Sequence, residues 1–286
     1  MKLIITGANG QLGNEIRELA HLYPKYTFLY TDIAELDITN AAEVNAYFGI
    51  HRPDVVINCA AYTAVDKAET DTETAFLVNA TASGNLAKAA QASGCFMVHV
   101  STDYVYDGRN YRPYTESDTV NPVSVYGKSK LAGEQEVLQS GARAIIIRTS
   151  WLYSAFGNNF VKTMIKYGRE REALNVVFDQ AGTPTYAFDL AKTILDILPK
   201  AVTSRETGIF HYSNEGVTSW YDFAKAIHEL AGINCRVSPI ATRDYPTPAK
   251  RPFFSVLDKS LIRNSFAIEI PYWRDSLKDC IKRLEP

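Results

Sequence analysis

The stretch KLIITGANGQLG, residues 2–13, decides the fold of this chain. Its residues 2–6 form a short apolar run, which predicts a buried parallel strand. Three glycines follow with the spacing G-x-x-G-x-x-G, and a helical pattern then runs from Asn14 to Leu22. A strand, a glycine-rich turn and a helix start together form a dinucleotide-binding unit, because the free N–H groups of the helix can hold a pyrophosphate.

Each glycine of this turn has a predicted task. Gly7 permits the tight turn, Gly10 lets the backbone approach a pyrophosphate, and Gly13 lets helix and strand pack closely. The spacing differs from the G-x-G-x-x-G of many dehydrogenases, so a purely structural turn is the alternative interpretation. The position directly after the first strand favours cofactor binding.

An acidic residue, Asp32, follows the next apolar run, Thr27–Tyr30. It stands where a carboxylate would bind the hydroxyls of an adenosine ribose, and a loop aspartate is the alternative. No Arg or Lys stands beside Asp32 to bind a 2′-phosphate. This favours NADH over NADPH but leaves both open.

Tyr126 and Lys130, in the run YGKSK, form a second pattern. Both fall on the predicted helix Val125–Gln139, four residues apart and therefore on one face. A neighbouring ammonium stabilises a phenolate, so we expect Lys130 to lower the pKa of Tyr126 and the two to act as an acid–base pair. Because such pairs also arise by chance, an amphipathic surface helix is the alternative.

Strands and helices alternate through the first half of the chain. Strand-like runs lie at Leu3–Thr6, Thr27–Tyr30, Val55–Asn58, Phe96–Ser101 and Ala144–Thr149, with helical patterns at Ala41–Phe48, Glu73–Ala92 and Val125–Gln139. This order predicts an α/β fold with a Rossmann-type, doubly wound parallel sheet that binds ligands at the carboxyl ends of its strands. Gly7, Asp32, residues 60–62 and Thr102 each follow a predicted strand, so we expect them along one edge.

The pattern loosens from about residue 150. Turn-rich segments at 178–185 and 245–252 separate further helical patterns, which lie at Asn159–Tyr167, Ala187–Leu198, Ser219–Leu230 and Trp273–Arg283. We expect residues 1–150 to form the dinucleotide-binding domain. Residues 151–286 then form a smaller, mainly substrate-binding lobe, with segments that return to the sheet.

Composition excludes several classes of function. The 286 residues carry a formal net charge of −2, which argues against nucleic-acid binding driven by bulk charge. Four scattered cysteines without a C-x-x-C indicate reduced cytosolic thiols, and five histidines show no metal-ligand spacing, so we predict no metal site and a core position for His99. The first strand starts at residue 2 and no apolar stretch could span a membrane, so we expect a cytoplasmic protein.

The chain resembles the extended short-chain dehydrogenase/reductases and, within them, the dTDP-4-dehydrorhamnose reductase family. The glycine turn and the Tyr126/Lys130 pair are typical of the superfamily. The narrower resemblance rests on AVDKAE (64–69), STDYV (101–105), Trp151 and DQAGTPT (179–185). Matching segments extend over most of the chain: 7–13, 58–69, 101–108, 126–130, 148–151, 157–160, 179–185 and 251–252.

The resemblance implies an oxidoreductase of dTDP-rhamnose and cell-surface polysaccharide biosynthesis. Such an enzyme reduces the C4 ketone of dTDP-4-dehydro-L-rhamnose to dTDP-L-rhamnose with hydride from NADPH or NADH. The catalytic set is implied to be Thr102, Tyr126 and Lys130. Tyr126 would donate the proton, Lys130 would hold the nicotinamide ribose, and the Thr102 hydroxyl would stabilise the carbonyl oxygen. For Thr102, a strand-end threonine that satisfies a backbone group is the alternative.

The same resemblance implies the binding residues. Cofactor-binding positions are Gly7, Gly10, Gln11, Leu12, Gly13, Asp32, Asp37, Ile38, Ala60, Ala61, Tyr62, Thr63, Tyr126 and Lys130. Substrate-binding positions are Thr102, Asp103, Tyr126, Trp151, Asn159, Gln180 and Arg251. We expect Trp151 to pack against the sugar, with core packing as the alternative. Arg251 and Lys162 are candidates for the diphosphate, with surface salt bridges as the alternative.

Two other functions remain open. One is a nucleotide-sugar epimerase or dehydratase of the same superfamily, although Tyr104 stands where a dehydratase usually has a glutamate after Asp103. The other is a non-catalytic dinucleotide-binding regulatory subunit, which the presence of Thr102, Tyr126 and Lys130 disfavours. Among partners we expect a dTDP-sugar and, as one compatible state, a homodimer, but neither nucleic acid nor membrane.

Overall fold

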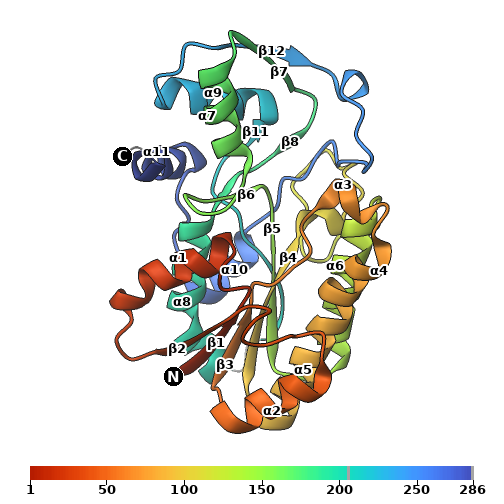
Figure 1. The fold of residues 1–286 in the computed structure, drawn as a ribbon, viewed down its shortest axis with the longest axis vertical. Coiled ribbons are helices and arrows are strands. Elements are labelled where there is room, and N and C mark those ends of the chain that lie inside the picture. Colours follow the sequence, from red (N-terminus) through yellow and green to blue (C-terminus); the bar gives the residue numbers. More distant parts are fainter. Residues whose placement is uncertain (205–206, 285–286) are drawn as a thin grey trace.

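A parallel sheet forms the centre of the molecule (Figure 1). The computed structural model describes residues 1–204 and 207–284, and within them this sheet has six strands in the order β10-β5-β4-β3-β1-β2. The strands are β1 (Lys2–Thr6), β2 (Thr27–Thr31), β3 (Val55–Asn58), β4 (Phe96–Thr102), β5 (Ala144–Thr149) and β10 (Gly208–His211). All neighbouring pairs run parallel, which confirms the predicted doubly wound α/β fold.

Helices cover both faces of the sheet (Figure 1). One face carries α1 (Gln11–Leu19), which continues as the 3₁₀ turn η1 (Ala20–Leu22), and α8 (Ala187–Ser204). The other face carries α2 (Ala41–His51), α5 (Ala82–Ser93) and α6 (Val125–Gln139). The strands are apolar on both faces, so an apolar layer lies on each side of the sheet. Ile5 packs into the layer under α1 and α8, and Ile4 packs into the layer under α2, α5 and α6.

Chain order and strand order diverge between β1 and β3. The chain runs from β1 outward to β2 and then returns to the other side of β1, where Thr6 pairs with Asn58. Ligands of open α/β sheets bind at such a switch point, outside the carboxyl ends of the strands. Further along the same edge Thr102 pairs with Thr149, so the ends of four strands lie side by side.

A smaller lobe lies above this edge (Figure 1). Its strands form three two-stranded ribbons, which are β7 (Ala173–Val177) with β12 (Arg236–Ile240), β8 (Ala181–Gly182) with β11 (Thr218–Ser219), and β6 (Leu152–Tyr153) with β9 (Thr185–Tyr186). The helices α7 (Phe160–Glu170), α9 (Trp220–Leu230) and α11 (Trp273–Leu284) pack around one aromatic-rich core. The short helix α10 (Ser260–Phe266) packs instead against α8 and β10.

The predicted helix Glu73–Ala92 is present, but it is not α-helical throughout. The structure divides it into α4 (Thr72–Phe76), a π-helical segment η2 (Leu77–Thr81) and α5. Apolar periodicity cannot report such a bulge, because the bulge places one extra residue in a turn without changing the side-chain types. The wider turn contains Asn79, which is completely buried.

No helix among the described residues is long and apolar enough to cross a membrane. His99, on β4, is fully buried and contacts the Asn58 amide at 3.1 Å, which confirms the core position predicted for it.

Candidate active site

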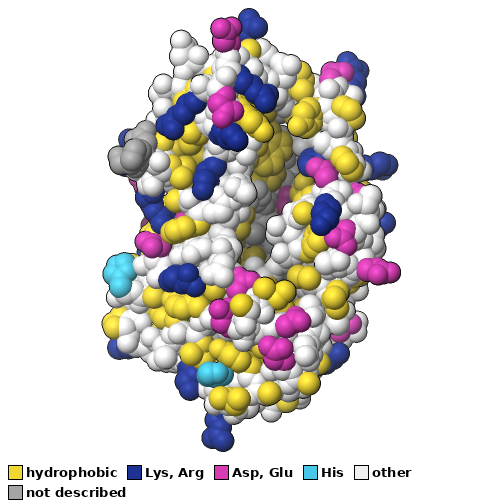
Figure 2. Space-filling model, viewed as in Figure 1, with side chains coloured by type: hydrophobic (Ala, Val, Ile, Leu, Met, Phe, Trp, Pro, Cys, Tyr) yellow, Lys and Arg dark blue, Asp and Glu magenta, His cyan; other side chains and the backbone are white. Residues whose placement is uncertain are grey.

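A cavity of about 850 Å³ opens along the carboxyl edge of the sheet, beneath the smaller lobe. Figure 2 shows this face of the molecule hollowed between the two parts. Most of the residues predicted from the sequence line it, namely Gly7, Gly10, Gln11, Leu12, Asp32, Asp37, Ile38, Ala60, Ala61, Thr63, Thr102, Asp103, Tyr126, Lys130, Trp151 and Asn159. The expectation that the strand-end motifs meet along one edge is therefore confirmed.

The glycine turn leaves space for a pyrophosphate. Gly7 has φ +62°, and a Cβ there would lie 2.7 Å from the Ala60 backbone nitrogen. A Cβ on Gly13 would lie 2.5 Å from the Ala8 Cα, so the start of α1 packs against the turn after β1 only because this residue is glycine. Gly10 caps α1 without a side chain, so the first-turn N–H groups face the cavity unblocked by a cap, as dinucleotide phosphates require.

Acidic side chains surround the far end of this turn. Asp32 accepts a hydrogen bond from the Asn9 backbone nitrogen at 3.1 Å, and its own nitrogen donates to Glu35 Oε2 at 2.9 Å. Asp37 Oδ1 accepts from the Thr39 hydroxyl at 2.7 Å. Two carboxylates, Asp32 and Glu35, are thus fixed beside the turn, where they suit ribose hydroxyls better than a second phosphate.

Tyr126 occupies the first turn of α6, above the end of β4. The helix starts at Ser124, whose side chain accepts from the Gly127 nitrogen at 3.1 Å. Gly127 is required there because any Cβ would collide with the Tyr104 carbonyl oxygen. Burial raises the pKa of Tyr126 to about 12, and a hydrogen bond between the phenol and Thr102 opposes part of this rise. At neutral pH the phenol therefore keeps its proton and can act as an acid.

Lys130 lies one turn further along α6, and its position corrects one expectation. Its ammonium donates to the Val100 carbonyl oxygen at 2.7 Å, and burial lowers the pKa of Lys130 to about 8. The expectation that Lys130 lowers the pKa of Tyr126 is wrong for this structure. Burial outweighs any charge effect on the phenol, and the neighbouring charge acting on it is that of Asp103, which raises its pKa further.

Asp103 follows Thr102 at the end of β4 and is only 2% exposed. Its Oδ1 accepts from the Thr102 hydroxyl at 3.0 Å. Burial raises the pKa of Asp103 to about 7, against hydrogen bonds from Thr102 and Ser255 that lower it, and its Oδ2 makes no close hydrogen bond within the described part of the chain. A buried polar atom without a partner, at a cavity wall, is a group that a ligand hydroxyl can satisfy.

Several supporting residues escaped the sequence analysis. Glu134, one turn beyond Lys130, forms a bidentate ion pair with Arg148 of β5 at 2.6 and 2.9 Å, and both side chains are almost completely buried. Asn79 accepts from the Tyr62 nitrogen at 2.8 Å and donates to the Ser129 hydroxyl at 2.9 Å, which ties the loop after β3 to α6. The four-residue spacing from Lys130 to Glu134 indicated that both lie on one face of the helix. Nothing in the sequence indicated that Arg148 is the partner of Glu134.

Some predicted residues bond elsewhere and do not line the cavity. Tyr62 donates through its hydroxyl to Asp71 at 3.0 Å, and Gln180 donates to the Thr242 hydroxyl at 3.0 Å. Arg251 forms an ion pair with Asp66 at 2.8 Å, and the Lys162 ammonium donates to the Ala155 carbonyl at 3.3 Å. Of the two candidates for the diphosphate, Arg251 is thus held in an ion pair, the alternative given for it.

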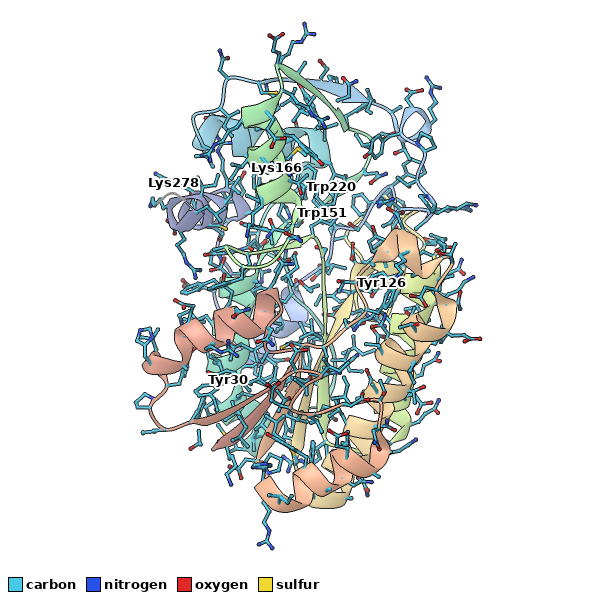
Figure 3. All side chains as sticks on the ribbon, viewed as in Figure 1. Tyr30, Tyr126, Trp151, Lys166, Trp220 and Lys278 are labelled. Atoms are coloured by element: carbon cyan, nitrogen blue, oxygen red, sulfur yellow. The ribbon has the colours of Figure 1, made fainter. Side chains whose placement is uncertain are left out.

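Two indole rings form the upper wall of the cavity. Trp151 follows β5, and Trp220 opens α9; their ring centroids are 3.6 Å apart and their planes differ by 9°. Figure 3 shows the pair on the lobe side of the cleft, with Tyr126 on the opposite side. Trp220 was absent from the predicted site because its sequence neighbours carry no motif.

Comparisons with known proteins agree with one another. The family model described as "RmlD substrate binding domain" matches residues 1–285. A curated dTDP-4-dehydrorhamnose reductase of Aggregatibacter actinomycetemcomitans is 43% identical over 97% of both chains. Among solved structures, the dTDP-4-dehydrorhamnose reductase of Clostridium acetobutylicum has a TM-score of 0.95 and 47% identity over the whole of both chains. That of Bacillus anthracis, in complex with NADP, has a TM-score of 0.92 and 40% identity over 98% of both chains.

Proposed function

The chain belongs to the RmlD substrate binding domain family, and from that premise we propose that it is an NAD(P)H-dependent dTDP-4-dehydrorhamnose reductase. The observation that carries the proposal is the meeting of Thr102, Tyr126 and Lys130 with an uncapped helix start in one cavity. The reaction reduces the C4 ketone of dTDP-4-dehydro-L-rhamnose to the alcohol of dTDP-L-rhamnose. Bound NADPH or NADH supplies the hydride.

The protein contributes a proton and charge stabilisation. Tyr126, whose pKa burial raises to about 12, gives its phenolic proton to the oxygen that becomes negative. The Thr102 hydroxyl donates a hydrogen bond to the same oxygen once it turns away from Asp103, its partner here at 3.0 Å. Lys130, buried in the lining of the same cavity, holds the ribose of the nicotinamide, the role that the family resemblance implies for it.

The direct test follows the absorbance of NADH and, separately, NADPH in the presence of dTDP-4-dehydro-L-rhamnose. The proposal expects one cofactor oxidised for each dTDP-L-rhamnose formed. Oxidation that requires both the sugar and Tyr126 would support the assignment. Clear dinucleotide binding without oxidation would instead favour an epimerase, a dehydratase or a regulatory subunit.

The proposal also covers the location of the enzyme, the division of the chain and its oligomeric state. We place the enzyme in the cytoplasm, where NAD(P)H is available, and we retain the division near residue 150 into cofactor-binding and substrate-binding parts. A homodimer is proposed from the family resemblance. Light scattering coupled to gel filtration tests that state, and a monomer across micromolar concentrations would reject it.

A further inference from the structure

The backbone of Trp151 adopts an unusual conformation. Its φ is +48°, in the left-handed region that bulky side chains rarely occupy. Such a conformation persists only when neighbouring groups hold it. The Trp151 carbonyl accepts from the Thr185 nitrogen at 3.2 Å, which fixes the backbone but leaves the direction of the indole ring to other contacts.

Two contacts hold the ring. The edge of the Trp151 indole lies against Gly182, where a Cβ would come within 2.6 Å of ring atom Cε2. One face of the indole stacks on Trp220 at 3.6 Å. Gly182 pairs with Thr218 in the β8–β11 ribbon, and Trp220 follows that ribbon by one residue, so a single short ribbon supplies both contacts.

Trp220 is itself well anchored. Its helix begins at Ser219, whose side chain accepts from the Asp222 nitrogen at 3.0 Å and donates to Asp222 Oδ2 at 2.6 Å. Phe160 of α7 packs on the Trp220 ring with a centroid distance of 4.6 Å. Because Trp220 is held by α9 and by Phe160 of α7, its stack restricts the movement of the Trp151 ring.

We infer that Trp220 is a positioning residue of the sugar site: its stack fixes the orientation of the Trp151 ring on the lobe side of the cleft, with Tyr126 on the opposite side (Figure 3). This inference rests on the proposed function, because it takes the 6-deoxy sugar as the group that lies against the indole wall. A fixed apolar wall favours one orientation of the sugar and so helps to direct the C4 ketone toward the proton donor. A mobile Trp151 would bind the same sugar in several orientations.

The test compares Trp220→Ala and Trp220→Phe with Trp273→Phe as the matched control. Trp273 is a buried indole of the same lobe core, but it does not line the cavity, and its ring contacts are with Phe223 at 5.8 Å and Tyr272 at 5.7 Å. We expect Trp220→Ala to raise KM for the sugar about tenfold and to lower kcat, with the dissociation constant of NADPH unchanged. Trp220→Phe retains a flat ring and should restore most of kcat/KM.

Two further measurements separate positioning from simple packing. Two stacked indoles couple and give a pair of bands of opposite sign in the circular dichroism spectrum. This pair should disappear in Trp220→Phe and in Trp151→Phe but persist in Trp273→Phe. In a double-mutant cycle, Trp220→Ala should add little to the loss in kcat/KM caused by Trp151→Ala, because it acts through that ring.

Other outcomes would overturn the inference. Unchanged sugar KM and kcat in Trp220→Ala, or additive losses in the cycle, would show that Trp220 only packs the lobe. Losses that appear equally in Trp273→Phe would show the same. If the unmodified chain does not reduce the sugar at all, the proposed function fails, whereas the dichroism still reports whether the stack exists.

Discussion

Tyr126 and Lys130 lie on one face of α6, but the structure shifts their pKa values in opposite directions. Burial raises the pKa of Tyr126 to about 12 and lowers that of Lys130 to about 8. Both shifts have one cause, because removing water disfavours the charged form of each group. The result suits reduction of a ketone, in which the tyrosine must start with its proton.

Tyr126→Phe tests this role. We expect kcat to fall about 10²- to 10⁴-fold, because the substitution removes the proton donor and almost no volume. The dissociation constant of NADPH, measured by quenching of protein fluorescence, should stay within a factor of about two of that of the unmodified chain. Turnover close to that of the unmodified chain would reject Tyr126 as the donor.

Asp103 yields a prediction for stability. Its pKa rises from 3.8 to about 7 on folding, so between these values the folded chain binds a proton that the unfolded chain has lost. Stability then decreases as pH rises from about 4 to 7 and stays reduced above that. Asp103→Asn, which cannot ionise, should melt a few degrees higher than the unmodified chain at pH 8 and no higher at pH 4. An equal difference in Tm at both pH values would show that Asp103 ionises freely in the folded chain.

Asp32 yields a prediction for cofactor choice. With Glu35 it places two carboxylates beside the turn that leads to the cavity. Asp32→Ala removes one of them, and we expect the ratio of kcat/KM for NADPH to that for NADH to rise about tenfold. Glu18→Ala, an exposed carboxylate of α1 outside the cavity lining, is the control. An unchanged ratio in Asp32→Ala would show that this residue does not read the ribose.

At the scale of elements, the strands and most helices were predictable because their apolar patterns repeat over several turns or alternate cleanly. The π-helical segment was not, since a sequence pattern shows neither the extra residue in its turn nor the long-range hydrogen bonds that its Asn79 makes. Asn79 bonds both backbone groups of Tyr62, at 2.8 and 3.1 Å, and the Ser129 hydroxyl. These partners are 17 and 50 residues away, beyond the window of any helical pattern.

Asn79→Ala tests the importance of this segment. The Tyr62 backbone groups would lose their partners in a buried place, at about 1–3 kcal/mol for each group left unsatisfied. We expect a lower free energy of unfolding in urea and, because the loop after β3 lines the cavity, a higher KM for NADPH. Ser93→Ala, at the far end of α5, removes only a bond to its own helix and should change neither by much. If the two variants behave alike, Asn79 does not anchor the loop.

At the scale of the whole molecule, the parallel sheet and its ligand-binding edge followed from chain order, but the lobe did not. Its two-residue strands are too short to show any period. The expectation that segments of the second half return to the sheet agrees with β10, Gly208–His211, which pairs with β5, but the position of this strand was not predicted. The contacts that close the molecule join distant segments. The Arg251–Asp66 pair spans 185 residues, and no local pattern could have placed it.

The longest such contact joins the first and last helices. Glu15 of α1 is completely buried and accepts from Arg283 of α11 at 2.8 Å and from the Ser154 hydroxyl at 2.6 Å. Ser154 Oγ in turn accepts from the Phe156 nitrogen at 2.9 Å, at the start of the loop whose residues 157–159 line the cavity. The network therefore connects the contact between α1 and α11 to the loop at residues 157–159 that lines the cavity.

Arg283→Met should lower both stability and substrate affinity. Removing one partner of a fully buried ion pair costs about 3–5 kcal/mol, and we expect about 2 kcal/mol here because Arg283 is 30% exposed. Lys282→Met is the matched control, since Lys282, the neighbour of Arg283 in the chain, forms an exposed pair with Asp279 three residues earlier, worth less than about 1 kcal/mol. In Arg283→Met the free energy of unfolding in urea should fall and the KM for the sugar should rise. In Lys282→Met neither quantity should change. A loss of stability without a change in KM would mean that the two ends of the chain close the fold but do not shape the site.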